Sequence, residues 1–452
     1  MTPRNIPRLS REVLARRPPG VWKYQAFLPR LGAEDVVSLG EGGTPLLPAA
    51  RLGNDLALDN LLIKDETRNP TGSFIDRGST VLMSLAKERG ITACSCVTTG
   101  NLGASLAAYC AKAGIEAKIK IHPNTDRGKL YQMIAFGAHV EAYRRQGNVT
   151  GSRDSLLVTA KNPYILEGEK TTCFEIVQDL GWNPPDVIVV PVGTGGHLTM
   201  IWRAIQELRK SKMIGNSKCR LLGVRFQGPS PEYDHSSAEG WLNKVEDSFT
   251  ELEESEPIFK KEAVLAMKAS GGEGLETTMR ETIKATSLLA RTEGIFAEPA
   301  SASVVASLQR AKARGLIGKD ETVVCIITGA GLKDTRAISK IARPNRRVVV
   351  RNDYAVARVQ VGETKLTLMR SLVNRPSFGY SLWKDFSLLR KITTASIYQH
   401  LGELEELAFV RKSSVVTVKG KERVFYELTR KGSDFVRISD QIGEPSRQSD
   451  RM

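Results

Sequence analysis

Residues 69–78 read Asn-Pro-Thr-Gly-Ser-Phe-Ile-Asp-Arg-Gly and follow the short apolar run Leu61–Lys64. Five more apolar runs of strand length come later in the chain: Ala93–Thr98, Ala117–Ile121, Val187–Val192, Arg220–Val224 and Val323–Ile327. Between them, several segments have apolar residues at three- and four-residue spacing: Leu102–Ala113, Lys129–Phe136, Glu169–Leu180 and Leu198–Arg209. Alternation of buried strands with such helices predicts an α/β domain with parallel sheet and right-handed crossovers.

Short polar or glycine-rich motifs accompany these runs. Besides residues 69–78 they include Gly20-Val-Trp-Lys-Tyr24, Leu39-Gly-Glu-Gly-Gly-Thr-Pro-Leu46, Thr98-Thr-Gly-Asn101, Val192-Gly-Thr-Gly-Gly-His197 and Thr328-Gly-Ala-Gly-Leu-Lys-Asp334. In this order they resemble the motifs of threonine synthases, members of the tryptophan-synthase-β-like (fold type II) family of pyridoxal phosphate enzymes. The resemblance covers about residues 15 to 340. It implies an α/β fold of two subdomains with parallel sheets and a pyridoxal phosphate site.

At Ile75 the chain departs from these enzymes, because the resemblance aligns their Schiff-base lysine with this isoleucine. That lysine holds the cofactor as an imine and then acts as general base. Isoleucine can do neither, and loss of a positioned acid–base group alone costs about 10²- to 10⁴-fold in rate. We therefore predict no catalytic residue here and a non-covalent hold on any bound cofactor. Lys64 and Lys129 are no obvious substitutes, because family members that keep the catalytic lysine also have lysines at similar places. A catalytic lysine elsewhere in the chain is the alternative.

The segment Val192-Gly193-Thr194-Gly195-Gly196-His197 follows a predicted strand and precedes a predicted helix. Glycines at such a place free backbone N–H groups to cradle an anion at a helix N-terminus. The resemblance implies that the anion is the phosphate of pyridoxal phosphate. A turn without any ligand is the alternative.

Asn101 and Thr328 complete the set that the resemblance assigns to the cofactor. In the family, the asparagine meets the phenolic oxygen of the pyridine ring, and the threonine hydroxyl faces the ring nitrogen. Asn101 also suits a helix N-cap, which needs no ligand. The segment Glu298-Pro-Ala-Ser301-Ala resembles the one beneath the cofactor, with packing as the alternative for Ser301.

A second departure concerns the substrate. The family's substrate loop reads Asn-Ser-x-Asn-Pro-Tyr-Arg-Leu-Glu-Gly, and its Asn, Ser and Arg hold the phosphate of O-phosphohomoserine. Residues 159–168 read Thr-Ala-Lys-Asn-Pro-Tyr-Ile-Leu-Glu-Gly, so Ile165 replaces the arginine and Ala160 the serine. Isoleucine cannot make the forked charge-assisted bonds that anchor a phosphoryl group. Lys161 offers only a point charge at a different position.

Composition limits the class of protein. No run of about twenty apolar residues and no apolar signal core occurs, which predicts a cytoplasmic protein without a membrane span. The cysteines lack Cys-x-x-Cys spacing, so we expect reduced core thiols rather than metal ligands or disulfides. They are Cys94, Cys96, Cys110, Cys173, Cys219 and Cys325.

The net charge of +15 is unevenly distributed. From Pro344 to Met452 there are 20 basic and 12 acidic residues in 109 positions, against 45 and 38 in the preceding 343. A basic terminal domain is typical of nucleic-acid binding, with a merely solvated surface as the alternative.

Arg343-Pro-Asn-Arg-Arg347 breaks the α/β rhythm and marks a linker, followed by the alternating stretch Val348–Val361. The polar, acidic segment Gly228–Glu256 is expected to be an insertion. We predict four parts: a threonine-synthase-like domain at 1–342, a linker at 343–362, a winged helix-turn-helix domain at 363–440 and a disordered tail at 441–452.

Residues Lys365–Val436 resemble winged helix-turn-helix regulators of the PadR-like kind. Leu366, Leu368, Met369 and Leu372 give a first helix an apolar face, and a short helix begins at Gly379. A recognition helix follows from Ile392, capped by Thr393 or Thr394, with its core residues at helical spacing. Two alternating strands around the basic turn Lys419-Gly-Lys421 form a wing, and a terminal helix begins near Thr429.

Double-stranded DNA is the partner that this domain implies, with protein pairing as the alternative. Base contacts are expected near the exposed end of the recognition helix, and phosphate contacts on the wing. The candidate DNA-binding residues are Thr394, Ser396, Tyr398, Gln399, Lys419, Lys421 and Arg423. His400 also lies near the groove-facing end of this helix, and Arg411 and Lys412 are further wing residues able to meet phosphates.

Three hypotheses follow. The first is a homodimeric DNA-binding regulator with a threonine-synthase-like pseudoenzyme as sensor of pyridoxal phosphate or an amino-acid-related ligand. The second is an active threonine synthase with a regulatory tail, in which an unrecognised amine does the work of the lysine. The third treats the large domain as a dimerisation platform only.

Overall fold

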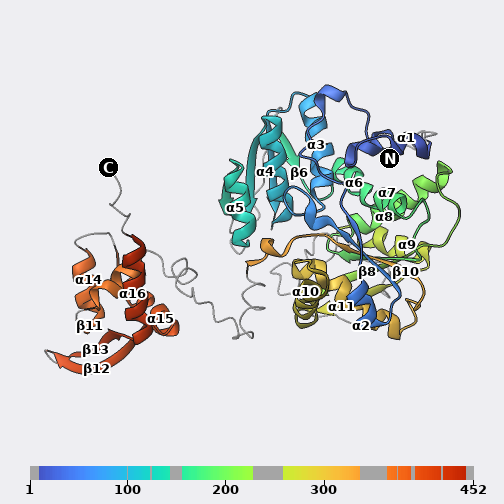
Figure 1. The fold of residues 1–452 in the computed structure, drawn as a ribbon. Coiled ribbons are helices and arrows are strands. Elements are labelled where there is room, and N and C mark those ends of the chain that lie inside the picture. Colours follow the sequence, from blue (N-terminus) through green and yellow to red (C-terminus); the bar gives the residue numbers. More distant parts are fainter. Residues whose placement is uncertain are drawn as a thin grey trace, which may run out of the picture. The chain divides into compact units, whose positions relative to one another are not determined.

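The computed structural model describes residues 10–98, 100–122, 125–142, 155–227, 258–335, 364–373, 375–387, 392–418 and 421–443. The chain divides into two compact units, Met1–Pro344 and Asn345–Met452 (Figure 1). Three predicted segments lie outside the described residues. They are the expected insertion Gly228–Glu256, the linker at 343–362 with the stretch Val348–Val361, and residues 444–452 of the expected tail.

A six-stranded sheet in the order β1-β2-β10-β7-β8-β9 forms the centre of the larger unit. Strand β1 pairs antiparallel with β2, and all other neighbours run parallel. Parallel neighbours cannot be joined by tight turns, so helices connect them. The strands are β1 (Leu46–Pro48), β2 (Asn60–Asp65), β7 (Val187–Val192), β8 (Arg220–Gln227), β9 (Gly274–Thr278) and β10 (Thr322–Ile327).

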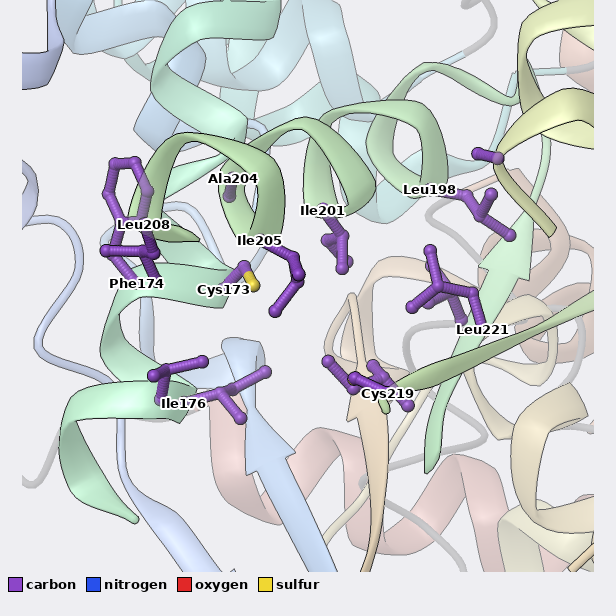
Figure 2. Packing of buried hydrophobic residues seen from close by; sticks show 14 of the residues in the cluster. Cys173, Phe174, Ile176, Leu198, Ile201, Ala204, Ile205, Leu208, Cys219 and Leu221 are labelled. Atoms are coloured by element: carbon purple, nitrogen blue, oxygen red, sulfur yellow. The ribbon is translucent and has the colours of Figure 1, made fainter. Parts of the chain in front are cut away.

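The central strand β7 supplies two cores, because successive side chains of a strand point to opposite faces. Ile188 and Val190 belong to one apolar cluster, and Val187 and Val189 to the other. Figure 2 shows the first cluster, in which side chains of α8 meet those of α7 and β8. The helices are α7 (Thr171–Asp179), α8 (Gly196–Lys210) and α9 (Lys260–Ser270) in the first cluster, and α2 (Ala50–Leu56), α10 (Met279–Glu293) and α11 (Pro299–Ala313) in the second.

A second sheet of four parallel strands, ordered β5-β4-β3-β6, forms the other subdomain. A third apolar cluster joins it to its helices. The elements are β3 (Ala93–Thr98), β4 (Glu116–Ile121), β5 (His139–Ala142), β6 (Ser155–Val158), α3 (Asp76–Glu88), α4 (Asn101–Ala113), α5 (Arg127–Ala135) and α6 (Pro163–Glu169). Short helices complete the unit: α1 (Arg11–Ala15), η1 (Val21–Phe27), η2 (Ala33–Asp35), η3 (Glu66–Arg68) and η4 (Gly331–Lys333).

The smaller unit has the winged-helix arrangement that the sequence predicts. Residues 364–371 are helical, and the core gathers Leu368, Met369, Leu401 and Phe435 among others. A three-stranded antiparallel sheet has the order β11-β13-β12. The elements are β11 (Ser377–Phe378), α14 (Gly379–Ser387), α15 (Thr394–Glu406), β12 (Val410–Val418), β13 (Lys421–Leu428) and α16 (Arg430–Gly443).

The α/β prediction is confirmed: all six predicted strands form, and the four predicted helices correspond to α4, α5, α7 and α8. The six cysteines are buried and unbridged. Among the described residues, no three potential His, Cys, Asp or Glu ligands form a metal-binding group. In the same part of the chain, no helix is long and apolar enough to cross a membrane.

Candidate cofactor site and winged-helix surface

The segment around Ile75 contacts two of the predicted site residues, Thr328 and His197. The Phe74 N–H donates to the Thr328 carbonyl over 3.0 Å, next to a bridge between Ser73 and Gly329. The Phe74 ring stacks on His197, with ring centroids 4.2 Å apart. Ile75 itself is half-buried and occupies the N-cap of α3 with helical backbone angles. The position at which the resemblance places an amine is thus held between the two subdomains.

The predicted glycine turn joins β7 to α8. Gly195 has a φ of +85°, and a Cβ there would meet the Phe259 carbonyl oxygen at 2.9 Å, so this position requires glycine. The Phe259 N–H donates to the Thr194 carbonyl over 2.8 Å and fixes the turn from one side. Gly193 is exposed, with nothing within 4 Å of the place for its Cβ. The turn therefore opens at Gly193, beside the first N–H groups of α8, which lack partners within the helix.

Asn101 is the first residue of α4, and its amide joins the two subdomains. Its Nδ2 donates to Glu298 Oε1 over 2.9 Å, while its Oδ1 is buried without a hydrogen-bond partner. The other Glu298 oxygen lies 3.5 Å from Lys129 Nζ. The aliphatic chain of Lys129 covers Gly100, where a Cβ would lie 2.3 Å from Lys129 Cδ. A buried, unsatisfied oxygen favours a missing hydrogen-bond donor at this site.

Thr328 and Ser301 meet on the large-sheet side of the same region. Their hydroxyl oxygens lie 2.7 Å apart, and both residues are buried. Ser301 lies in the first turn of α11, and Thr328 directly follows β10. The contact brings the two segments together, and that they border one cofactor site stays a prediction.

His197 is buried in the first turn of α8. Its Nε2 lies 3.3 Å from the Thr172 hydroxyl, and its Nδ1 has no partner. Burial lowers the pKa of His197 to about 3, so the ring is neutral at physiological pH. The side chain therefore contributes a neutral, polar edge and an aromatic face rather than a charge.

A buried charge network lies directly behind the site. Arg77, fully buried on α3, makes two bonds to Glu66 and two to Glu175, all between 2.7 and 2.8 Å. Lys64 Nζ lies 2.9 Å from Glu175 and donates to the Thr44 carbonyl. The ammonium of Lys64 is thereby engaged in this network.

Ile165 lies in the apolar cluster of the smaller subdomain and is 2% exposed. It packs on Gly78, where a Cβ would lie 2.6 Å from Ile165 Cγ2. Lys161 is exposed, and its backbone N–H bonds to the Thr159 hydroxyl. The isoleucine is thus part of the apolar packing of this subdomain.

On the smaller unit, α15 presents the predicted recognition residues. Thr393 caps the helix by accepting from the Ser396 N–H. Tyr398 and Gln399 are exposed, and Thr394 and Ser396 are half-buried. The Gln399 amide donates to Glu403 over 3.0 Å.

The wing strands carry fewer unpaired cations than the sequence suggests. Arg411 pairs with Glu427 at 2.7 Å, and Lys412 with Glu405 at 3.1 Å. The Arg423 guanidinium lies 4.4 Å above the centre of the Phe378 ring. Lys419 lies outside the described residues, and of Lys421 the structure describes only the backbone, as the first residue of β13.

Phe74 and Lys129 are the site residues that sequence reasoning did not assign. The position of Phe74 next to Ile75 was a signal that could have found it. The counterparts of Lys129 in family members were a signal for it, but its approach to Glu298 depends on the packing of α5 beside α4.

Comparison with known proteins agrees with this architecture. Residues 37–329 match the model of the pyridoxal-phosphate dependent enzyme family, and residues 368–437 match the PadR-like family of transcriptional regulators. Threonine synthase of Methanocaldococcus jannaschii is 38% identical over 345 residues, which cover 73% of this chain and 84% of that protein. Threonine synthase of Methanosarcina acetivorans is 36% identical over 373 residues, covering 79% and 91%.

Solved structures show the same fold. Threonine deaminase isoform 2 from Solanum lycopersicum superposes with a TM-score of 0.52 at 16% identity, over 73% of this chain and 96% of that one. A fungal L-serine ammonia-lyase from Rhizomucor miehei gives 0.52 at 19%, over 66% and 97%. The chain therefore belongs to the pyridoxal-phosphate dependent enzymes of fold type II, with a PadR-like domain fused behind them.

Proposed function

We propose that this chain is a ligand-sensing, DNA-binding transcription regulator whose sensor is a catalytically impaired threonine-synthase-like domain. One observation carries the proposal: the same chain has isoleucine at position 75 and a PadR-like domain at its C-terminus. Such a regulator would work in the cytoplasm. It would bind DNA as a homodimer, because winged-helix dimers read paired half-sites. A ligand would shift the dimer between states through its different affinities for them.

The residues present suit a non-covalent hold on pyridoxal phosphate. The turn Gly193–His197 offers backbone donors to a phosphate at the N-terminus of α8. The unsatisfied Asn101 Oδ1 would accept from a protonated ring substituent, and the Thr328 hydroxyl would face the ring nitrogen. When bound, the cofactor supplies an electron sink for carbanions. Ile75 has no proton to give or take, so binding would not lead to turnover.

The second candidate is a working threonine synthase with a regulatory tail. It is favoured by relatives of 36–38% identity that bear this name and are matched over most of their length. It requires an amine from another lysine. Among the described residues, Lys129 lies 3.5 Å from Glu298, the carboxylate that also accepts from Asn101, so Lys129 is the lysine to examine.

Borohydride reduction of the purified wild-type protein with added cofactor separates these candidates. We expect saturable binding of pyridoxal phosphate without a pyridoxyl group on any lysine, as measured by intact-protein mass spectrometry. The physical reason is that Ile75 offers no amine to the aldehyde. A pyridoxyl group on Lys129, together with threonine formation from O-phosphohomoserine, would support the enzyme instead. Absence of any binding would leave only a platform role.

The wing assignment has a separate test. Alanine at both Lys419 and Lys421 is expected to weaken DNA binding and to lower the slope of log K against log salt by about 1.8, since each phosphate that a lysine neutralises adds about 0.9 to that slope. Gel shifts over a range of salt concentrations measure both effects. Arg411→Ala is the matched control, because Arg411 is already paired with Glu427. Equal effects of the double variant and the control would contradict the assignment.

A further inference from the structure

A cavity of about 240 Å³ lies beside the cofactor site, behind the turn that leads to Ile75. Its walls come from residues 67–72, from α5 and from the segment after β10. Leu332, which is 71% exposed, lies at the rim, so the cavity has access to solvent there. Neither the glycine turn nor Asn101 lines it.

Lys333 places a cation in the wall of this cavity. The residue is 3% exposed, and its Nζ donates to the Thr71 carbonyl over 2.7 Å and to Gln132 Oε1 over 2.9 Å. Both acceptors are neutral, and no ion pair among the described residues includes Lys333. Burial lowers the pKa of Lys333 to about 8, against the raising influence of Glu298 and Asp76. An ammonium has three protons, so one is left for a further acceptor.

The other polar side chains of the wall are already engaged. Thr67 donates to Asp65, and the Asn69 amide donates to Glu66 while its oxygen accepts from Gly42. Gln132 binds both the Thr71 carbonyl and Lys333. The wall therefore offers a buried ammonium that has no carboxylate of the described residues within ion-pair distance, with Asp76 and Glu298 farther away but near enough to raise its pKa. A buried cation without a direct ion pair favours an anionic ligand.

We propose that this cavity binds a small organic anion with one carboxylate, held by Lys333, as the effector of the regulator. That the bound anion is an effector rests on the proposed function, whereas the binding of an anion at Lys333 does not. The turn at 69–72 connects the two sites. The Gly72 carbonyl accepts from the Ala330 N–H over 2.9 Å, and the chain then continues into Phe74 and Ile75. An anion that bonds to the third proton of Lys333 would share the ammonium that also holds the Thr71 carbonyl, and so bear on this turn.

Isothermal titration of the full chain with acetate and propionate tests the proposal. We expect saturable binding to the wild type and a loss of about tenfold or more in Lys333→Met, since a hydrogen bond to a charged group is removed. Lys312→Met is the matched control, because Lys312 Nζ also donates to two carbonyls, those of Leu56 and Ala57, away from the cavity. The control is expected to bind like the wild type. Thermal unfolding verifies that each variant is folded.

Inorganic phosphate serves as a second probe, because the glycine turn is the other anion site. If Lys333→Met loses acetate binding but still binds phosphate, the phosphate is bound at the glycine turn, and the assignment of the carboxylate site to Lys333 stands. Acetate binding that is equal in all three proteins would show an adventitious ion only and overturn the proposal, as would no acetate binding at all. Failure of the protein to shift DNA would overturn the regulator function while leaving a carboxylate site at Lys333.

Discussion

Ile75→Lys is expected to convert a non-covalent cofactor site into a covalent one. After incubation with pyridoxal phosphate and reduction with borohydride, the variant should carry one pyridoxyl group on residue 75, located by peptide mass spectrometry. The wild type should carry none. Position 75 is suited to this because Phe74 is fixed by the Thr328 carbonyl and by the His197 ring, so the amine would start from a constrained backbone.

Ile75→Met is the control, since it changes the side chain without adding an amine. Turnover of O-phosphohomoserine by Ile75→Lys is expected to stay low, because Ile165 and Ala160 still replace the residues that hold the substrate phosphate in the family. Two results would contradict the expectation. One is a pyridoxyl group on another lysine of the wild type, and the other is cofactor binding by Ile75→Lys without any adduct at residue 75.

The fold was largely predictable where strands are buried on both faces. Such strands are continuous apolar runs, as in Val187–Val192, and all six predicted runs are strands of the larger unit. The four strands of this unit that the sequence did not predict, β1, β5, β6 and β9, are the edges of the two sheets. Edge strands are covered less, so their sequences need no apolar run: β5 reads His-Val-Glu-Ala and is mostly exposed.

The candidate site was predictable as a set of segments but not as a set of contacts. Ligand sites of parallel sheets lie beyond the carboxyl ends of the strands, and the motifs at Asn101, Gly193 and Thr328 each follow a strand. The bond between Asn101 and Glu298 joins residues 197 positions apart and depends on how the two subdomains meet. The cavity at Lys333 has the same origin, because α5 and η4 form its walls only after the sheets are assembled.

The buried network behind the site gives the largest expected effect on stability. Arg77→Met leaves Glu66 and Glu175 buried without their guanidinium, and removal of one partner of a buried ion pair costs about 3–5 kcal/mol. Arg314→Met is the matched control: Arg314 pairs with Glu273, and both side chains are exposed, at 46% and 37%, so about 0–1 kcal/mol is expected. Urea unfolding of the full chain, followed by circular dichroism, measures both.

The pH dependence of the same variant identifies the cause. In the wild type, burial raises the pKa of Glu66 but Arg77 outweighs it, so the folded pKa is lowered and stability falls on acidification. Without Arg77, burial dominates and the folded pKa lies above the unfolded value. The folded variant then binds more protons than the unfolded chain, and its stability falls as the pH rises above about 4.5.

The free-energy loss in Arg77→Met should therefore be larger at pH 8 than at pH 5, and adding Glu66→Gln should reduce that difference. A loss of equal size at both pH values, or one no greater than that of Arg314→Met, would show that the network does not depend on the charge of Arg77.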